Sequence, residues 1–218
     1  MTFTQTLHEL AKESWTKSKQ HPFVQELVAG SLPIEVFRFY LLQDAYYLKH
    51  FASAHQEVIK RTKDQRIIDS QRFCKEGLEE SELMIRQEFF KELQITKEEV
   101  AKTSIAPTAY FYTSHIYRQF VDGTLQTALS ALLPCYWLYY EIGATFASKS
   151  SPVKIYQDFL ETYDSDGFKQ VLDELISLVD ELAETVSEDE REAMKQAFMI
   201  SSQCELDFWE MSYTQETW

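Results

Sequence analysis

Apolar side chains recur every three or four residues through most of this 218-residue chain. This spacing places apolar residues on one face of a helix and is typical of amphipathic helices rather than strands. Only five glycines and five prolines are present, which leaves few turn residues for a many-stranded sheet. We therefore predict an all-α protein with about seven substantial helices joined by short connectors.

Helix boundaries in the first half of the chain follow from glycine, proline and capping residues. The first predicted helix spans the apolar positions between Leu7 and Trp15, and a short one runs from His21 to the stop signal at Gly30. Pro33 opens a long helix that reaches about Arg61. A fourth helix starts near Asp64, and its buried stripe is Ile67, Cys74, Leu78, Ile85 and Phe89.

The next two helices are separated by a clear stop signal. One begins at Pro107 and ends at Asp122-Gly123, after which Thr124 can cap a helix that runs to about Ser148. Pro134 falls inside this second helix and removes one backbone donor. We expect a kink immediately before Cys135, which would help to aim that side chain.

Two helices remain near the C-terminus. Ser165 precedes the stripe Phe168, Val171, Leu172, Leu175, Val179 and Leu182. Ser187, with Glu190 three residues later, predicts a capping box that starts a last helix reaching about Tyr213. Amphipathic helices joined by short loops bury their stripes against one another, so we predict one antiparallel helical bundle over residues 1–218.

The charge balance limits the classes of partner. Lysine and arginine number 21 and aspartate and glutamate 35, which gives a formal net charge of −14. Such a field repels nucleic-acid phosphates and anionic membrane surfaces. Residues 1–20 contain no apolar signal core, and no stretch approaches the roughly 20 apolar residues that cross a bilayer. We expect a soluble, cytoplasmic protein that binds neither nucleic acid nor membrane.

The three cysteines, Cys74, Cys135 and Cys204, lie far apart and form no Cys-x-x-Cys pair. This pattern fits reduced thiols rather than a disulfide framework or a zinc site. Cys135 follows Pro134 in the apolar stretch LLPCYWLYYE (residues 132–141). A thiol in such surroundings is usually inert packing, yet a neighbouring base would make it a nucleophile. Both interpretations stay open on this stretch alone.

Two carboxylates, Asp44 and Glu205, fall on apolar faces of predicted helices. Their helical neighbours are mainly aromatic: Phe37, Tyr40, Tyr47 and Phe51 for the first, and Phe198, Ser201, Phe208 and Trp209 for the second. A structural ion pair is the common explanation for such a carboxylate. Burial can also raise a carboxyl pKa by up to about 3 to 5 units, which suits proton transfer near neutrality. We expect a catalytic site that combines both carboxylates with Cys135.

Tyrosines from several segments accompany these groups. Tyr139 lies four residues after Cys135, so phenol and thiol project from one side of a helix. Tyr47, Tyr112 and Tyr163 come from three other segments. Aromatic rings at helical spacing are usually core residues. Tyrosines that converge on a thiol and carboxylates would suit a flat, polar, nitrogen-containing ring.

The histidine pattern does not favour a metal or cofactor. None of the five histidines has a glutamate three residues before it, so the Glu-x-x-His pattern of di-iron bundles is absent from the sequence. The His-Glu-x-x-His motif is absent as well. His8 could in principle serve as an axial haem ligand, although a lone histidine near an N-terminus is more often a surface residue. We predict no metal and no cofactor.

These residues occur in motifs that resemble the TenA family, also called thiaminase II or aminopyrimidine aminohydrolase. The resemblance covers nearly the whole chain, in this order: HPFVQ (21–25), LPIEVFRFYLLQDAYYLKHF (32–51), PTAYFYTSHIY (107–117), ALLPCYWLYYEIG (131–143) and ISSQCELDFWEMSY (200–213). It implies a haem-oxygenase-like helical fold that needs no haem, usually assembled as a homotetramer. It also implies hydrolysis of 4-amino-5-aminomethyl-2-methylpyrimidine to the hydroxymethyl pyrimidine in thiamin salvage, with slower cleavage of thiamin itself.

The resemblance also assigns roles to the candidate residues. It places Cys135 at the nucleophile, Glu205 at the acid/base, and Asp44 at the carboxylate that assists the thiol and contacts the substrate. The four tyrosines hold or orient the pyrimidine: Tyr47, Tyr112, Tyr139 and Tyr163. Two alternatives remain open, which are a non-catalytic pyrimidine-, thiamin- or haem-binding protein of the same fold and a protein with an indirect regulatory role.

Overall fold

A computed structural model describes the backbone of residues 1–79, 83–163 and 165–218, and every secondary-structure element in these ranges is helical. The side chains of residues 83–86 also lie outside the description. The helices are α1 (Phe3–Gln20), α2 (Pro22–Ala29), α3 (Ile34–Arg61), α4 (Gln65–Gly77), α5 (Leu83–Glu92), α6 (Lys97–Lys102), α7 (Pro107–Arg118), α8 (Leu125–Phe146), α9 (Lys154–Glu161), α10 (Asp166–Glu184) and α11 (Glu188–Thr214). The all-α prediction is confirmed.

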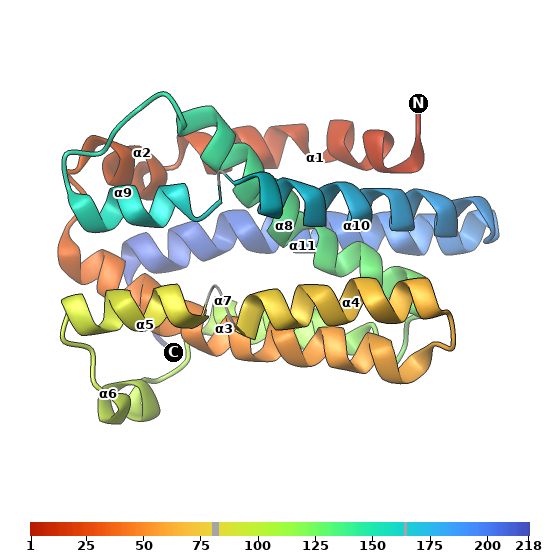
Figure 1. Ribbon diagram of the computed structural model, residues 1–218, viewed down its shortest axis with the longest axis horizontal. Helices are drawn as coiled ribbons and strands as arrows, with labels where there is room; N and C mark the ends of the chain where they lie inside the picture. Colours follow the sequence, from red (N-terminus) through yellow and green to blue (C-terminus); the bar gives the residue numbers. More distant parts are fainter. Residues whose placement is uncertain (80–82, 164) are drawn as a thin grey trace.

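The long helices run along the long axis of the molecule (Figure 1). α1, α10 and α11 lie in the upper part of this view, and α3 runs antiparallel to α4 in the lower part. α8 passes through the middle and packs against α11, α10 and α3. Buried residues line every face of α8, as expected for a helix surrounded by others. In the described part of the chain, no helix is long and apolar enough to cross a membrane.

Several helix boundaries confirm the predicted caps. Gly30 ends α2 in the left-handed conformation, with φ of 75°. The side chains of Thr124, Ser165 and Ser187 accept hydrogen bonds from backbone N–H groups in the first turns of α8, α10 and α11. The capping box predicted at Ser187 is only half formed, because the Glu190 carboxylate accepts a hydrogen bond from the Thr124 hydroxyl instead and so links the starts of α8 and α11.

One predicted boundary needs correction. α7 ends at Arg118 rather than at Asp122-Gly123, because the following residues form tight turns in which the Val121 N–H bonds to the Arg118 carbonyl. The helix predicted from Asp64 onwards corresponds to α4 and α5 in the described residues, and its continuity through residues 80–82 lies outside the description. The predicted burial of Ile85 falls outside the described side chains.

Pro134 lies inside α8, as predicted, and is buried. Proline has no backbone N–H, so residue 134 cannot donate a hydrogen bond to the preceding turn. The kink that we expect just before Cys135 stays a prediction.

Gly30 provides a test of how tightly the α2–α3 corner is built. Its φ is positive, and an added Cβ would lie 2.5 Å from Cγ of Pro152. Gly30→Ala should therefore lower the free energy of unfolding by about 1–3 kcal/mol in urea denaturation. Gly167→Ala is the matched control, because a Cβ there meets no atom within 4 Å and the residue lies in a helix. Equal stabilities of the two variants would show that the corner tolerates a side chain.

Candidate active site

Asp44 lies on the inner face of α3. Helical spacing puts it on the same stripe as Tyr40, Tyr47 and Phe51, and all four side chains are buried, with Asp44 only 3% exposed. The stripe faces the middle of the bundle, where α3 packs against α7, α8 and α11. The carboxylate is therefore enclosed by aromatic rings rather than by solvent.

Asp44 and Cys135 line the same small cavity, which we call the reactive cavity. Its wall includes five of the seven predicted site residues, which are Asp44, Tyr47, Cys135, Tyr139 and Tyr163. They come from α3, α8 and the turn that follows α9. The cavity has about 20 Å³ of space that a water-sized sphere can occupy, which is room for one or two water molecules.

Glu205 and Tyr112 lie next to this cavity and are not part of its wall as described. Glu205 on α11 is 2% exposed, and its Oε1 accepts a 2.6 Å hydrogen bond from the Tyr112 hydroxyl. The Tyr112 ring in turn packs against the ring of Tyr47, with 4.8 Å between the centroids. Glu205 is thus connected to the cavity wall through two tyrosines.

Burial dominates the electrostatics of Glu205. It raises the pKa of this carboxyl group from 4.5 to about 8, and the negative charge of Asp44 adds to the increase. The hydrogen bond from Tyr112 acts in the opposite direction, since it stabilises the carboxylate. A group with this pKa can both give and accept a proton near neutral pH.

The tyrosines stay neutral under these conditions. Burial raises the pKa of Tyr47, Tyr112 and Tyr139 well above the ordinary value, and neighbouring acidic groups raise it further. For Tyr47 the largest of these neighbours is Cys135, and for Tyr112 it is Glu205. Neutral phenols can donate hydrogen bonds to a bound ring or to a carboxylate.

Tyr139 is held from two sides. Its hydroxyl lies 3.1 Å from that of Tyr40, and its ring centroid lies 4.8 Å from that of Tyr163. These contacts fix the position of the phenol next to Cys135, one helical turn away. A flat ring that enters the cavity would therefore meet the Tyr139 ring in a fixed position.

A buried chain of polar side chains, which was not predicted from the sequence, lies beside the cavity. Tyr136 lines the reactive cavity, and its hydroxyl lies 3.0 Å from Nε2 of His55. Nδ1 of His55 lies 2.7 Å from Oε1 of Gln71. His55 lies four residues after Phe51 on the stripe of Asp44, a position that could have identified it as an inward-facing histidine. Tyr136 could not be predicted in this way. It directly follows Cys135, and adjacent residues of a helix normally point in different directions.

The other two cysteines differ from Cys135 in their surroundings. Burial raises the pKa of Cys74 to about 12 and raises that of Cys204 as well. Both thiols are therefore un-ionised at neutral pH and poor nucleophiles. Cys135 is half-buried and lines the reactive cavity. Among the three thiols, its position is the one suited to reaction with a bound molecule.

The described residues contain no group of three or more histidine, cysteine, aspartate or glutamate side chains placed to hold a metal ion. His8, the candidate haem ligand, is engaged elsewhere. Its Nε2 lies 2.5 Å from Oε1 of Glu141, and its ring stacks on Trp137 with 5.0 Å between the centroids. The histidine therefore contacts Glu141 and Trp137 on the side of α1 that faces α8.

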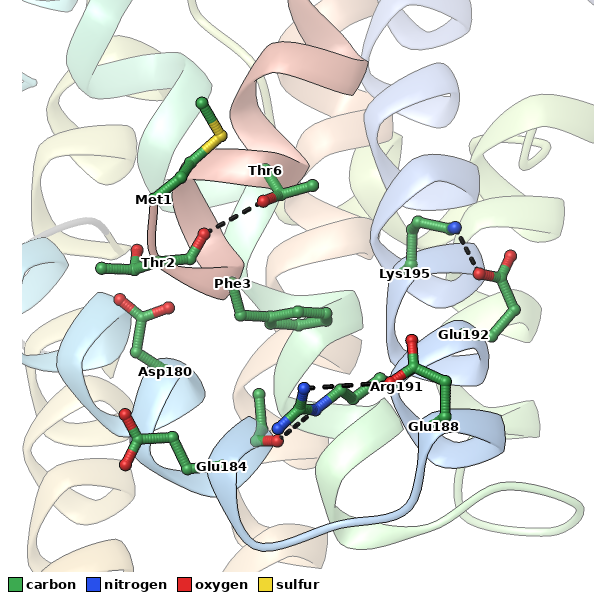
Figure 2. Close-up of a pocket in the computed structure, with 11 residues that line it drawn as sticks. Met1, Thr2, Phe3, Thr6, Asp180, Glu184, Glu188, Arg191, Glu192 and Lys195 are labelled. Atoms are coloured by element: carbon green, nitrogen blue, oxygen red, sulfur yellow. Dashed lines mark hydrogen bonds and ion pairs between the residues drawn. The ribbon is translucent and has the colours of Figure 1, made fainter.

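A larger hollow lies between the start of α1 and the facing parts of α10 and α11 (Figure 2). Its charged side chains are engaged in local contacts. Nε of Arg191 donates to the Ala183 carbonyl at 2.6 Å, and Lys195 pairs with Glu192. Its described wall contains no cysteine and none of the predicted site residues. The reactive groups thus gather in the small cavity rather than in this larger hollow.

Comparison with solved structures defines the class of protein. A domain from Shewanella denitrificans OS217, described as having a heme oxygenase-like fold, superposes with a TM-score of 0.73 at 12% identity, over 97% of this chain and 92% of its own. The TenA homologue from P. horikoshii OT3 gives a TM-score of 0.87 at 28% identity, over 98% of this chain and 99% of its own. The fold is therefore an all-helical bundle of the haem-oxygenase-like type.

Sequence comparison places the chain within this class. The model of the TENA/THI-4/PQQC family matches residues 8–215. The aminopyrimidine aminohydrolase of Bacillus subtilis (strain 168) is 42% identical over 218 residues, which cover all of this chain and 92% of that relative. The chain belongs to the TENA/THI-4/PQQC family, as its motifs predicted.

The buried His55 predicts a pH-dependent stability. Burial lowers its pKa from 6.5 to about 4, so the folded protein keeps this ring neutral while the unfolded chain binds a proton below pH 6.5. Its contribution to the free energy of unfolding is therefore present above pH 6.5 and falls by about 3 kcal/mol as the pH decreases to 4. Urea denaturation across this range measures the effect.

His55→Gln is the control for this measurement. Glu205, whose pKa is raised on folding, has the opposite dependence, because its contribution is lost as the pH rises from 4.5 to 8. The difference in stability between the parent protein and the variant therefore isolates His55 from Glu205. A difference that stays constant between pH 4 and 6.5 would contradict the assignment.

Proposed function

We propose that this protein hydrolyses 4-amino-5-aminomethyl-2-methylpyrimidine to the 5-hydroxymethyl pyrimidine and ammonia, a reaction of thiamin salvage. We also propose a slower cleavage of thiamin into the same pyrimidine and the thiazole alcohol. The observation that carries the proposal is the shared cavity of Asp44 and Cys135, with the neighbouring Glu205 carboxyl at a pKa of about 8. The name of the 42% identical relative supports the substrate class.

Cys135 forms the covalent bond in the proposed mechanism. Asp44, in the wall of the same cavity, accepts the thiol proton, and the thiolate adds to C6 of the pyrimidine. The electron pair of the broken ring double bond goes to the adjacent ring nitrogen, which takes up a proton. The ring is then no longer aromatic, and the amino group at C4 becomes an enamine that can expel a group from the methylene on C5.

Glu205 transfers protons in the second half of the reaction. It protonates the departing amine, which leaves as ammonia and creates an exocyclic double bond at C5. Water adds to this methylene and returns a proton to Glu205, and loss of the Cys135 thiolate together with the ring N–H proton restores the aromatic ring. A carboxyl group with a pKa of about 8 is suited to both transfers.

Tyr139 and Tyr163 are proposed to hold the pyrimidine, together with Tyr47 and Tyr112. Their neutral hydroxyls provide donors for ring nitrogens, and their faces provide stacking surfaces. A pyrimidine ring is larger than the one or two water molecules for which the cavity has room. Binding therefore requires side chains of the wall to move.

We also propose a cytoplasmic homotetramer. The described surface includes several exposed aromatic side chains around the start of α7, where Tyr110, Phe111 and Trp218 are 54%, 57% and 82% exposed. The rings of Tyr110 and Trp218 lie near each other, with 6.3 Å between the centroids. Clustered exposed aromatic residues favour burial against another protein surface, and a second copy of this chain is the partner that we propose.

Product analysis tests the proposed reaction. The purified protein should form the hydroxymethyl pyrimidine from the aminomethyl pyrimidine and, at a lower rate, from thiamin. Cys135→Ser should reduce both rates by at least about a thousandfold, because a serine hydroxyl is far less ionised than a thiol. Cys204→Ser is the matched control, since that thiol is buried away from the cavity wall. Near-normal turnover by Cys135→Ser would exclude the covalent mechanism.

The pH dependence of turnover tests the role of Glu205. With a pKa of about 8, this group is mostly protonated at pH 7 and loses its proton as the pH rises, so kcat/KM should fall about tenfold per unit above pH 8. Glu205→Gln should lower kcat by at least about a hundredfold, change KM little and remove this alkaline limb.

Tyr112→Phe provides the matched comparison. The hydrogen bond from Tyr112 lowers the pKa of Glu205, so its loss should move the alkaline limb to higher pH. If the limb keeps its position in both variants, the titrating group is not Glu205.

A further inference from the structure

A second cavity, which we call the outer cavity, adjoins the reactive cavity. It has about 260 Å³ of space that a water-sized sphere can occupy, compared with about 20 Å³ for the reactive cavity. Leu78, Tyr136 and Phe168 line both spaces. These three side chains therefore form the wall that separates Cys135 from the outer cavity.

Phe168 is the part of this wall that is best placed to move. Leu78 and Tyr136 are each 4% exposed, and the Tyr136 hydroxyl is held by His55. Phe168 is half-buried in the first turn of α10, and its ring contacts those of Tyr163 and Tyr136, with 5.6 Å and 5.9 Å between the centroids. Rotation of this ring would join the two cavities without separating any pair of packed helices.

Two glycines line the outer cavity, Gly77 at the end of α4 and Gly167 at the start of α10. Neither has a positive φ, and a Cβ added to either would meet no atom within 4 Å. Glycine weakens a helix relative to alanine, so neither the backbone conformation nor close packing accounts for these residues. What the two glycines provide is free space in the outer cavity, from two different helices.

The rest of the outer cavity suits a flat and weakly polar group. Its remaining wall combines aromatic, aliphatic and small uncharged polar side chains, which are Phe73, Phe168, Val171, Cys74, Thr162 and Ser165. Within the described part of the chain, no charged residue lines this space. Aromatic faces without a competing charge accommodate neutral heterocycles and delocalised cations.

We propose that the outer cavity is a leaving-group subsite. It receives the group on the 5-methylene of the substrate when that group is larger than an amine, such as the thiazolium ring of thiamin. This inference rests on the proposed function of the reactive cavity, since the pyrimidine must sit beside Cys135 for its substituent to point past Phe168. The small amine of the aminomethyl pyrimidine stays within the reactive cavity and makes no use of the outer one.

The experiment introduces large side chains into the outer cavity and measures ligand affinity rather than turnover. In a Cys135→Ser background, dissociation constants for thiamin and for the aminomethyl pyrimidine are measured by calorimetry. Gly77→Phe and Gly167→Phe should each weaken thiamin binding at least about tenfold and leave pyrimidine binding within about twofold. Gly77→Ala and Gly167→Ala are the matched controls and should leave both constants within about twofold, because the added Cβ leaves most of the space open.

Each outcome of this experiment decides the question. Unchanged thiamin binding in both phenylalanine variants would overturn the inference, and so would an equal loss of affinity for the two ligands. If the Cys135→Ser protein binds the pyrimidine and not thiamin, the inference is overturned together with the proposed cleavage of thiamin, while the proposed hydrolysis of the aminomethyl pyrimidine stands. A background protein that binds neither ligand would refute the proposed function, and the leaving-group subsite with it.

Discussion

The organisation of this protein depends on the burial of two carboxyl groups, Asp44 and Glu205, in one aromatic interior. Loss of water around Glu205 favours its protonated form, the charge of Asp44 favours it further, and the Tyr112 hydroxyl partly compensates through a 2.6 Å hydrogen bond. Neither side chain faces solvent, and the charge state of Glu205 depends on where Tyr112 lies. The tyrosine positions depend in turn on how α3, α7, α8 and α11 pack.

Aromatic contacts between these helices hold the reactive groups in register. The Tyr40 ring stacks on Trp209 with 5.6 Å between the centroids, which joins α3 to α11 one turn from Asp44 and Glu205 respectively. Tyr40 also meets Tyr139 on α8 through their hydroxyls. Each of the three helices thus carries one reactive group and one aromatic residue that contacts another of the three helices. A shift of one helix would change the distance between the acid and the thiol, so packing and chemistry share the same residues.

The part of the site that could be predicted from the sequence consists of residues that break a pattern. Asp44 and Glu205 interrupt apolar stripes at helical spacing, and such an interruption is visible without coordinates. The caps of α8, α10 and α11 could be predicted for a related reason, since a capping residue acts on its own first turn. The wall shared by the two cavities could not, because Leu78 and Phe168 are ordinary apolar residues of their segments. Their role arises from contacts between α4, α8 and α10, which the sequence does not encode locally.

The difference between the three thiols follows from their position relative to the cavity rather than from their helices alone. Cys74 and Cys204 lie on apolar helix faces much as Cys135 does, but burial raises the pKa of each and keeps it protonated. Cys135 lies where α8 passes the reactive cavity, with Asp44 in the same wall. The bundle therefore presents Cys135, and neither of the other two thiols, to the reactive cavity in which the pyrimidine would bind. This selection requires α8 to be surrounded on every side except the one that borders the cavity.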